Sequence, residues 1–98
     1  MTINKTANDS ALELALEGRL DTTTAPALEE ELKASLEGVT ELVLDFEKLE
    51  YISSAGLRVL LSAQKRMNKQ GTMTIRKVCA DIMEVFEITG FADILTVE

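Results

Sequence analysis

Hydrophobic and more polar residues alternate one by one near the start of the chain. Leu12, Leu14 and Leu16 are each followed by a charged or small residue, and the turn signal Asn8–Ser10 separates them from a polar, β-tolerant stretch at residues 2–6. A period of two is typical of an antiparallel strand pair that has one face in water. The pattern therefore predicts an N-terminal hairpin that ends at residues 18–21.

Apolar residues recur every three or four positions in the next segment, as they do on one face of an amphipathic helix. This stripe consists of Ala25, Leu28, Leu32 and Leu36. Hydroxyl groups in Thr22–Thr24 can accept a hydrogen bond from a free helical N–H, and Pro26 is tolerated in a first turn. The segment is therefore predicted to be a helix that begins near Pro26 and ends at Gly38.

The same spacing predicts a second helix, from the Ser53–Ser54 pair to Gly71. Its predicted buried stripe is Leu57, Leu60, Leu61 and Met67, with Val59 and Ala63 alongside. Farther along, Asp81 with Glu84 three residues later resembles a capping box. That signature predicts a short third helix, which ends at Gly90.

Three other segments have the composition of strands. The apolar run Leu42–Leu44 predicts a strand covered on both faces, residues 72–76 alternate as a strand does, and residues 95–97 predict a last strand. The predicted order is β-β-α-β-α-β-α-β in one domain spanning residues 1–98. Strands joined through helices become parallel neighbours, so the predicted fold class is α/β, a mixed and mostly parallel sheet with helices packed against it.

The residue types that the chain lacks exclude several kinds of catalytic and metal-binding site. Its 98 residues include no His, and Cys79 is its single Cys. Without His, the Ser-His-Asp and Cys-His nucleophile systems and all His-ligated metal sites are excluded. No Gly-rich phosphate loop supports nucleotide binding. We therefore expect no metal, no cofactor and no enzymatic activity.

Charge and targeting signals bear on partners and location. The net charge is −7, with 12 acids and 4 bases in residues 1–50 against 5 acids and 6 bases in residues 51–98. Such a chain repels a phosphate backbone, so we expect no direct nucleic-acid binding. A protein with a basic groove is a better match as a binding partner. A lone Cys, no signal peptide and no apolar run long enough to span a membrane favour the cytoplasm.

The Ser53–Ser54 pair is the main candidate for chemistry. A Ser before a helix is usually an N-cap, and that interpretation needs no further function. The position also suits a phosphoryl acceptor, because small neighbours at Ala55 and Gly56 leave the hydroxyl approachable and a helix N-terminus favours an anion. A nucleophilic Ser would need a base, for which Lys48 or Lys69 could serve only if buried, so a hydrolase is disfavoured.

Asp21, at the end of the predicted hairpin, also has two interpretations. Its carboxylate can accept hydrogen bonds from nearby backbone N–H groups in a strand-to-helix turn. It can instead belong to a docking surface, because both strand-to-helix turns are predicted to open on the same edge of the sheet. Sites on open α/β sheets usually lie at that edge.

The two turns resemble the two hallmarks of the STAS domain, in the form of stand-alone bacterial anti-sigma factor antagonists. The first is Gly18-Arg19-Leu20-Asp21, and the second begins Ile52-Ser53-Ser54-Ala55-Gly56-Leu57. The resemblance extends over the length, the element order and a final short helix that ends in Thr89-Gly90-Phe91. Where the family commonly has Asp-Ser-Ser/Thr-Gly-Leu, this chain has Ser53 in place of Asp and Ala55 in place of the hydroxyl residue.

This resemblance implies a phosphorylation-controlled binding switch. The unphosphorylated form would bind an anti-sigma factor, usually also a Ser/Thr protein kinase, and so free a sigma factor for RNA polymerase. The kinase would phosphorylate the Ser that opens the helix, Ser54 in the family register, and a Ser phosphatase would reset it. The implied partner-binding residues are Asp21, Thr22, Thr23, Thr24, Ser53, Ala55, Gly56 and Arg58.

Two interpretations of the function remain open at this point. In the first, Ser54 is phosphorylated and the protein is a regulatory switch. In the second, Ser54 is only a cap, and the domain is a constitutive STAS interaction module in a larger signalling or transport assembly. Intact mass after incubation with ATP and the candidate kinase distinguishes the two.

Overall fold

The computed structural model describes all 98 residues. Its elements, in chain order, are β1 (Thr2–Asn8), β2 (Ala11–Leu20), α1 (Ala25–Ser35), β3 (Glu41–Ile52), α2 (Ser54–Gln70), β4 (Thr72–Arg76), α3 (Ala80–Thr89) and the 3-10 helix η1 (Phe91–Asp93). The predicted single α/β fold is confirmed, and the predicted element order holds as far as the third helix.

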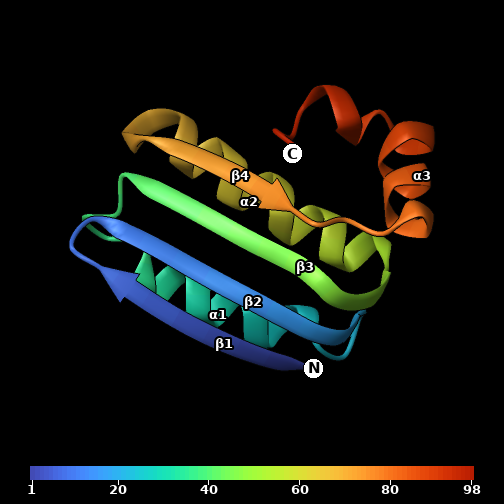
Figure 1. Cartoon of the computed structure of the whole chain (residues 1–98), viewed down its shortest axis with the longest axis horizontal. Coiled ribbons are helices and arrows are strands. Elements are labelled where there is room, and N and C mark those ends of the chain that lie inside the picture. Colours follow the sequence, from blue (N-terminus) through green and yellow to red (C-terminus); the bar gives the residue numbers. More distant parts are fainter.

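The strands form one sheet in the order β1-β2-β3-β4 (Figure 1). β1 and β2 are antiparallel and joined by a tight turn, in which Asp9 has a φ of 55°. β2, β3 and β4 are parallel, as expected for strands whose connections contain helices. The predicted hairpin and the mostly parallel, mixed sheet are therefore confirmed.

The predicted last strand is wrong in its extent. After η1 the chain pairs with β4 only through Val97, in one isolated parallel bridge to Ile75. The Ile75 N–H donates to the Thr96 carbonyl, and the Glu98 N–H donates to the Ile75 carbonyl, each at 2.9 Å. The chain first turns to bury Leu95, which is 5% exposed, and this leaves only the last few residues beside β4.

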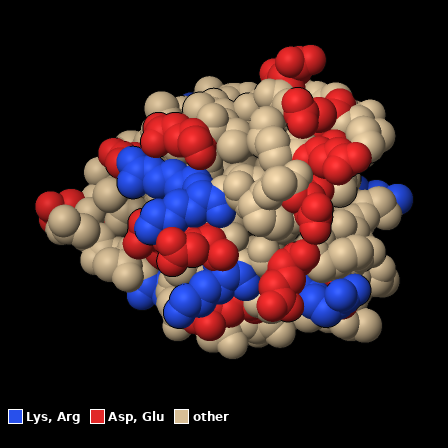
Figure 2. Space-filling model, turned by 45° about the vertical axis from the view of Figure 1, so that its right-hand side comes forward, with Lys and Arg blue, Asp and Glu red and all other residues tan.

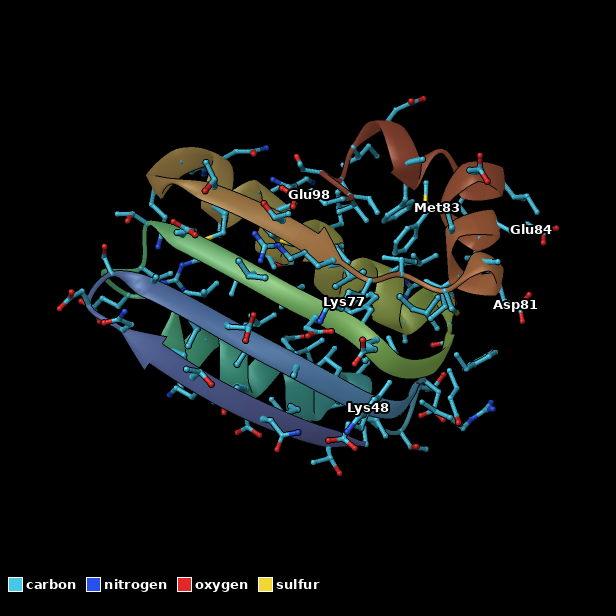
Figure 3. All side chains as sticks on the ribbon, viewed as in Figure 1. Lys48, Lys77, Asp81, Met83, Glu84 and Glu98 are labelled. Carbon is cyan, nitrogen blue, oxygen red and sulfur yellow. The ribbon has the colours of Figure 1, made fainter.

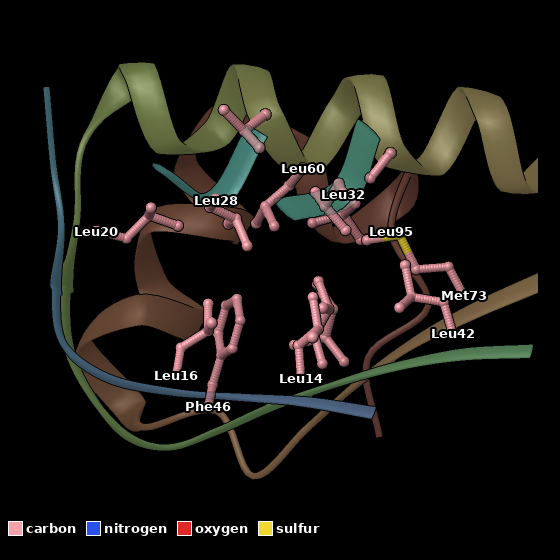
Figure 4. Close-up of a cluster of buried hydrophobic side chains, with 14 of the residues drawn as sticks. Leu14, Leu16, Leu20, Leu28, Leu32, Leu42, Phe46, Leu60, Met73 and Leu95 are labelled. Carbon is pink, nitrogen blue, oxygen red and sulfur yellow. The ribbon is translucent and has the colours of Figure 1, made fainter. Parts of the chain in front are cut away.

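The core lies between the sheet and the helices on one of its faces. Figure 1 shows α1 and α2 behind the sheet, whereas α3 lies beyond the end of β4. Leucines from β2, β3, α1 and α2 fill this layer together with Phe46 (Figure 4). All three residues of the run Leu42–Leu44 are buried, as the sequence predicts. Val43 is buried although it lies on the face of the sheet that carries no helix; it is 8% exposed and lies in register with Glu13 and Thr74 of the flanking strands.

The start of α3 differs from the predicted capping box. The N-cap residue is Cys79, and no side chain caps the helix. Asp81 therefore lies within the first turn, where a carboxylate still interacts favourably with the helix dipole. The predicted end is confirmed, because Gly90 adopts the left-handed conformation that stops a helix, with a φ of 81°.

Candidate functional site

The two strand-to-helix turns that the sequence singles out lie side by side. Leu20 at the end of β2 is in register with Ile52 at the end of β3. The Ser53 N–H donates to the Leu20 carbonyl at 2.9 Å, and this bond ties the start of α2 to the turn that precedes α1. The expectation that both turns open on one edge of the sheet is therefore confirmed.

Ser53 and Ser54 have different structural roles. Ser53 is the N-cap of α2: its Oγ accepts from the Gly56 N–H at 3.4 Å, and its carbonyl accepts from the Leu57 N–H at 3.0 Å. Ser54 is the first residue of the helix, and its side chain is exposed. The capping role thus belongs to the first serine, and the second faces solvent beside the unpaired N–H groups of the first turn.

Gly56 is buried, in contrast to the exposed position of Ser54. A Cβ atom at Gly56 would lie 2.7 Å from Cγ of Leu20 and 2.9 Å from Cγ1 of Ile52. The first turn of α2 can therefore approach the ends of β2 and β3 only because this residue has no side chain. Gly56 positions the site and does not form its surface, whereas Ala55 is half-buried at the surface.

The Asp21 turn is held by its own carboxylate. Oδ1 of Asp21 accepts from the N–H groups of Thr23 and Thr24, at 3.0 and 3.1 Å, and from the Thr23 hydroxyl at 2.8 Å, and the Thr24 hydroxyl oxygen lies 3.2 Å away. The Thr23 hydroxyl above all, with the two N–H groups, holds the pKa of Asp21 below its usual value, against a smaller opposing effect of desolvation. The predicted bonding of Asp21 to nearby backbone N–H groups is confirmed.

The threonines do not cap α1 as the sequence suggested. Thr24 occupies the N-cap position, but its side chain accepts no hydrogen bond from the helix. Instead its hydroxyl donates to the Arg19 carbonyl at 2.8 Å and accepts from the Asp21 N–H at 2.8 Å. The Ala25 N–H is satisfied by the Asp21 carbonyl, also at 2.8 Å. The hydroxyls therefore fix the turn and not the helix, and Thr22 and Thr23 remain exposed.

A shallow groove brings together three of the predicted partner-binding residues, Thr22, Ala55 and Arg58. It runs between the first turns of α1 and α2, and Ala25, Pro26, Glu29 and Val59 complete its lining. The exposed side chain of Arg58 lies one helical turn after Ser54 on α2. A partner that covers this groove would therefore approach the Ser54 hydroxyl as well.

Arg19 and Tyr51 belong to the same edge of the sheet and were not singled out from the sequence. The Arg19 guanidinium lies 4.1 Å from the centre of the Tyr51 ring, and its Nε lies 3.7 Å from Oδ2 of Asp21. Tyr51 remains 40% exposed. The contact joins β2 to β3, so no local pattern in the sequence could indicate it.

Comparisons with known proteins agree with this geometry. A family model described as Mlab, STAS domain matches residues 3–96. A Bordetella bronchiseptica protein, provisionally named the anti-sigma factor antagonist BtrV, is 41% identical over 91 residues, which cover 91% of this chain and 78% of that protein. The anti-sigma-B factor antagonist of Staphylococcus aureus is 31% identical over 99 residues, covering 99% and 92% of the two chains.

A solved structure also shares the fold. The Bacillus cell fate determinant SpoIIAA in its phosphorylated form superposes with a TM-score of 0.77 at 16% identity, covering 99% of this chain and 91% of that one. Within this fold, none of the helices has both the length and the apolar character needed to cross a membrane. The match of a family model to nearly the whole chain, together with the two relatives above 30% identity, shows that the chain belongs to the STAS domain family of anti-sigma factor antagonists.

Proposed function

We propose that this protein is a binding switch controlled by phosphorylation of Ser54. In its unphosphorylated form it binds an anti-sigma factor that is also a Ser/Thr protein kinase, and this frees a sigma factor for transcription. A Ser phosphatase restores the binding form. The switch acts in the cytoplasm by protein contacts alone, without catalysis by this chain and without direct contact to nucleic acid.

The observation that carries the proposal is the division of roles between the two serines. Ser53 caps α2 through its Oγ, whereas Ser54 is exposed at the first helical position. A kinase therefore reaches the Ser54 hydroxyl without breaking a hydrogen bond that holds the helix. The groove lined by Thr22, Ala55 and Arg58 offers a partner a surface next to this residue, because Ala55 directly follows Ser54 in the chain. Among the relatives, the phosphorylated state of SpoIIAA supports phosphorylation as a mode of control.

Phosphorylation at this position should act on the partner more than on the fold. A phosphate at the first turn of α2 meets free N–H groups and the positive end of the helix dipole, so the domain itself tolerates it. In a closely packed interface, the same group of nearly −2 charge must lose its water without a prepared counter-ion. The Asp21 carboxylate in the neighbouring turn adds to the local negative charge.

The test is direct phosphorylation of the purified chain. Incubation with ATP and the candidate anti-sigma kinase of the same genome, followed by intact mass measurement, should show a single phosphoryl addition. The addition should disappear in Ser54→Ala and persist in Ser53→Ala. Peptide mapping that places the phosphate on Ser53 or within residues 22–24 would contradict the assignment.

A constitutive interaction module is the second candidate, and one observation favours it. Ser53 stands where the motif that this turn resembles has Asp, so the carboxylate that the motif places beside the phosphoryl acceptor is absent from this chain. If the protein is such a module, it binds its partner whether or not Ser54 is modified. Equal affinity of the phosphorylated and unphosphorylated forms for the anti-sigma factor would establish this alternative.

A further inference from the structure

A second surface, apart from the Ser54 edge, combines exposed apolar side chains with negative charge. Ile88 on α3 is 76% exposed, and Ile94 just after η1 is 48% exposed. They are two of the three large hydrophobic residues exposed anywhere in the molecule. We name as the α3–η1 surface these two isoleucines and the acidic residues around them in sequence, Asp81, Glu84, Glu87 and Asp93.

The core does not require the isoleucine at position 88. α3 is anchored by Ile82 and Phe86, which are 1% and 0% exposed, on the opposite side of the helix. Ile88 leaves most of its side chain in water, where a polar residue would cost no packing. Single exposed hydrophobic residues are common, but two within seven positions point to a surface that is covered in a complex.

The charge of this region is of one sign. Residues 78–98 contain five acidic side chains and no Lys or Arg. Glu98 pairs with Arg76 at 3.3 Å, whereas the four acids of the α3–η1 surface take part in none of the ion pairs of the molecule. Figure 2, which turns this end forward, shows acidic side chains in a band that has uncharged surface on either side in its middle part and Lys or Arg beside its lower end. In Figure 3, Asp81 and Glu84 point away from the body of the molecule.

The beginning of this surface, at the start of α3, lies at the same edge of the sheet as the candidate site. α2 follows β3 and α3 follows β4, and the two strands are parallel, so both helices begin at their carboxyl ends (Figure 1). The start of α3 also contacts the end of β3, where Sγ of Cys79 lies 4.0 Å from the Leu49 carbonyl oxygen. A partner that covers the first turn of α2 can therefore also reach the first turn of α3, where Asp81 lies.

We infer that the anti-sigma factor of the proposed function contacts the α3–η1 surface with a basic patch that has an apolar centre. The apolar centre covers Ile88, and the surrounding Lys or Arg side chains face the unpaired carboxylates. The contact is a second docking surface, which adds affinity and guides association. It rests on the proposed function but not on the phosphorylation of Ser54, because none of its residues belongs to the α2 turn.

The experiment compares binding of the anti-sigma factor to three variants of the full chain. Ile88→Ser should weaken binding about tenfold, as truncation of a covered apolar contact does. The pair Glu84→Gln and Glu87→Gln should slow association and reduce its dependence on salt. The control pair Glu37→Gln and Glu41→Gln, two exposed acids at the opposite end of β3, removes the same charge and should leave the association rate near that of the wild type.

Each outcome decides the matter. Wild-type rates and affinity in both α3 variants, alongside weakened binding by Ser54→Asp, would overturn this inference and leave the proposed function intact. An equal loss in the control pair would mean that net charge is responsible, and would also overturn it. No binding by the wild-type protein would overturn the proposed function and this inference together. Melting curves show whether each variant is folded. If Ile88→Ser is unfolded, the inference is tested by comparing the association rate of the Glu84→Gln and Glu87→Gln pair with that of the control pair.

Discussion

At the scale of single residues, the candidate site divides between side chains that hold its shape and side chains that meet a partner. Ser53, Gly56 and Asp21 are committed to internal contacts, through a cap, a close approach and a hydrogen-bonded turn. Ser54 and Arg58 are exposed. Substitutions in the first group should therefore change stability, and substitutions in the second should change binding.

The two serines provide the first test of this division. Ser53→Ala removes the N-cap of α2 and should lower the free energy of unfolding by about 0.5 to 1 kcal/mol, at the weaker end for a cap because the bond to the Gly56 N–H is long. Ser54→Ala, at an exposed position, should change it by less than about 0.5 kcal/mol. Urea titration of both variants measures the free energy of unfolding. A larger loss of stability in Ser54→Ala than in Ser53→Ala would show that Ser54, and not Ser53, is the N-cap.

Gly56→Ala should be destabilising, although Ala is the better helix former. The new methyl group would lie 2.7 Å from Cγ of Leu20, so α2 must move away from the sheet or Leu20 must leave its rotamer. Overpacking of this kind costs about 1 to 3 kcal/mol, more than the gain of about 1 kcal/mol in helix propensity. Thermal unfolding measures the balance, and Ala34→Gly, in the exposed part of α1, serves as the control for propensity alone. A Gly56→Ala variant that is more stable than the wild type would show that α2 lies farther from the ends of β2 and β3 than the structure indicates.

Asp21 should make stability depend on pH in the acid range. Its pKa is lowered in the folded state from the ordinary value of 3.8, mainly by the Thr23 hydroxyl, so the unfolded chain binds the proton more tightly. The contribution is therefore fully present above that value and is lost as pH falls through the lower, folded value. The free energy of unfolding of the Asp21→Asn variant should therefore decline less steeply than that of the wild type as the pH falls below about 4. Unfolding titrations at pH 6, 4 and 3 test this, with Asp93→Asn as a control for the lost charge.

At the scale of elements, α2 holds the site through its buried face. Leu60 is fully buried, and Leu57 and Met67 lie on the same side of the helix, as Figure 4 shows for Leu60 above the leucines of the sheet. Leu60→Ala should lower the free energy of unfolding by about 2 to 5 kcal/mol. Leu61→Ala should cost less, because Leu61 is only half-buried. Denaturant titrations with a loss of less than about 1 kcal/mol for Leu60→Ala would place this face outside the core.

The elements that the sequence predicted well are those with a long, regular pattern. The alternation in β2 and the helical spacing in α2 each repeat several times, so one misleading residue does not change the result. Even there the buried face differs from the predicted one: Leu61 is only half-buried, whereas Gln64, which was not predicted to be buried, is 6% exposed. A polar amide at that position gives no signal of burial in the sequence.

Short patterns failed because other interactions compete with them. The acid pair at Asp81 and Glu84 resembles a capping box, yet the helix begins two residues earlier, with Cys79 and not Asp81 as its N-cap, and is anchored by buried apolar residues. The side chain of Thr24, before α1, forms its hydrogen bonds with the backbone of Arg19 and Asp21 and not with the helix. For the site, the sequence predicted the two turns and their shared edge, but not the burial of Gly56 or the contact of Arg19 with Tyr51. Both depend on how β2 and β3 meet.

At the scale of the whole molecule, phosphorylation and folding should be separable. A phosphate on Ser54 would lie at the exposed N-terminus of α2, where the helix dipole favours it, so the stability of the domain should be unchanged or raised by roughly 0.3 to 1 kcal/mol. In the proposed interface, the anti-sigma factor covers that charge together with Ala55 and the Asp21 turn. Its affinity should fall by roughly a hundredfold or more, about 3 kcal/mol.

Melting and binding measured on the same two samples, with and without the phosphate, separate these effects. The expected result is a melting temperature that is equal or slightly higher after modification, together with the large loss of affinity. A melting temperature many degrees lower would mean that the switch works by unfolding α2. If the α3–η1 surface also contacts the partner, weak residual binding should survive phosphorylation and should decrease further in the phosphorylated Ile88→Ser variant, because the more exposed of the two isoleucines of that surface is then lost.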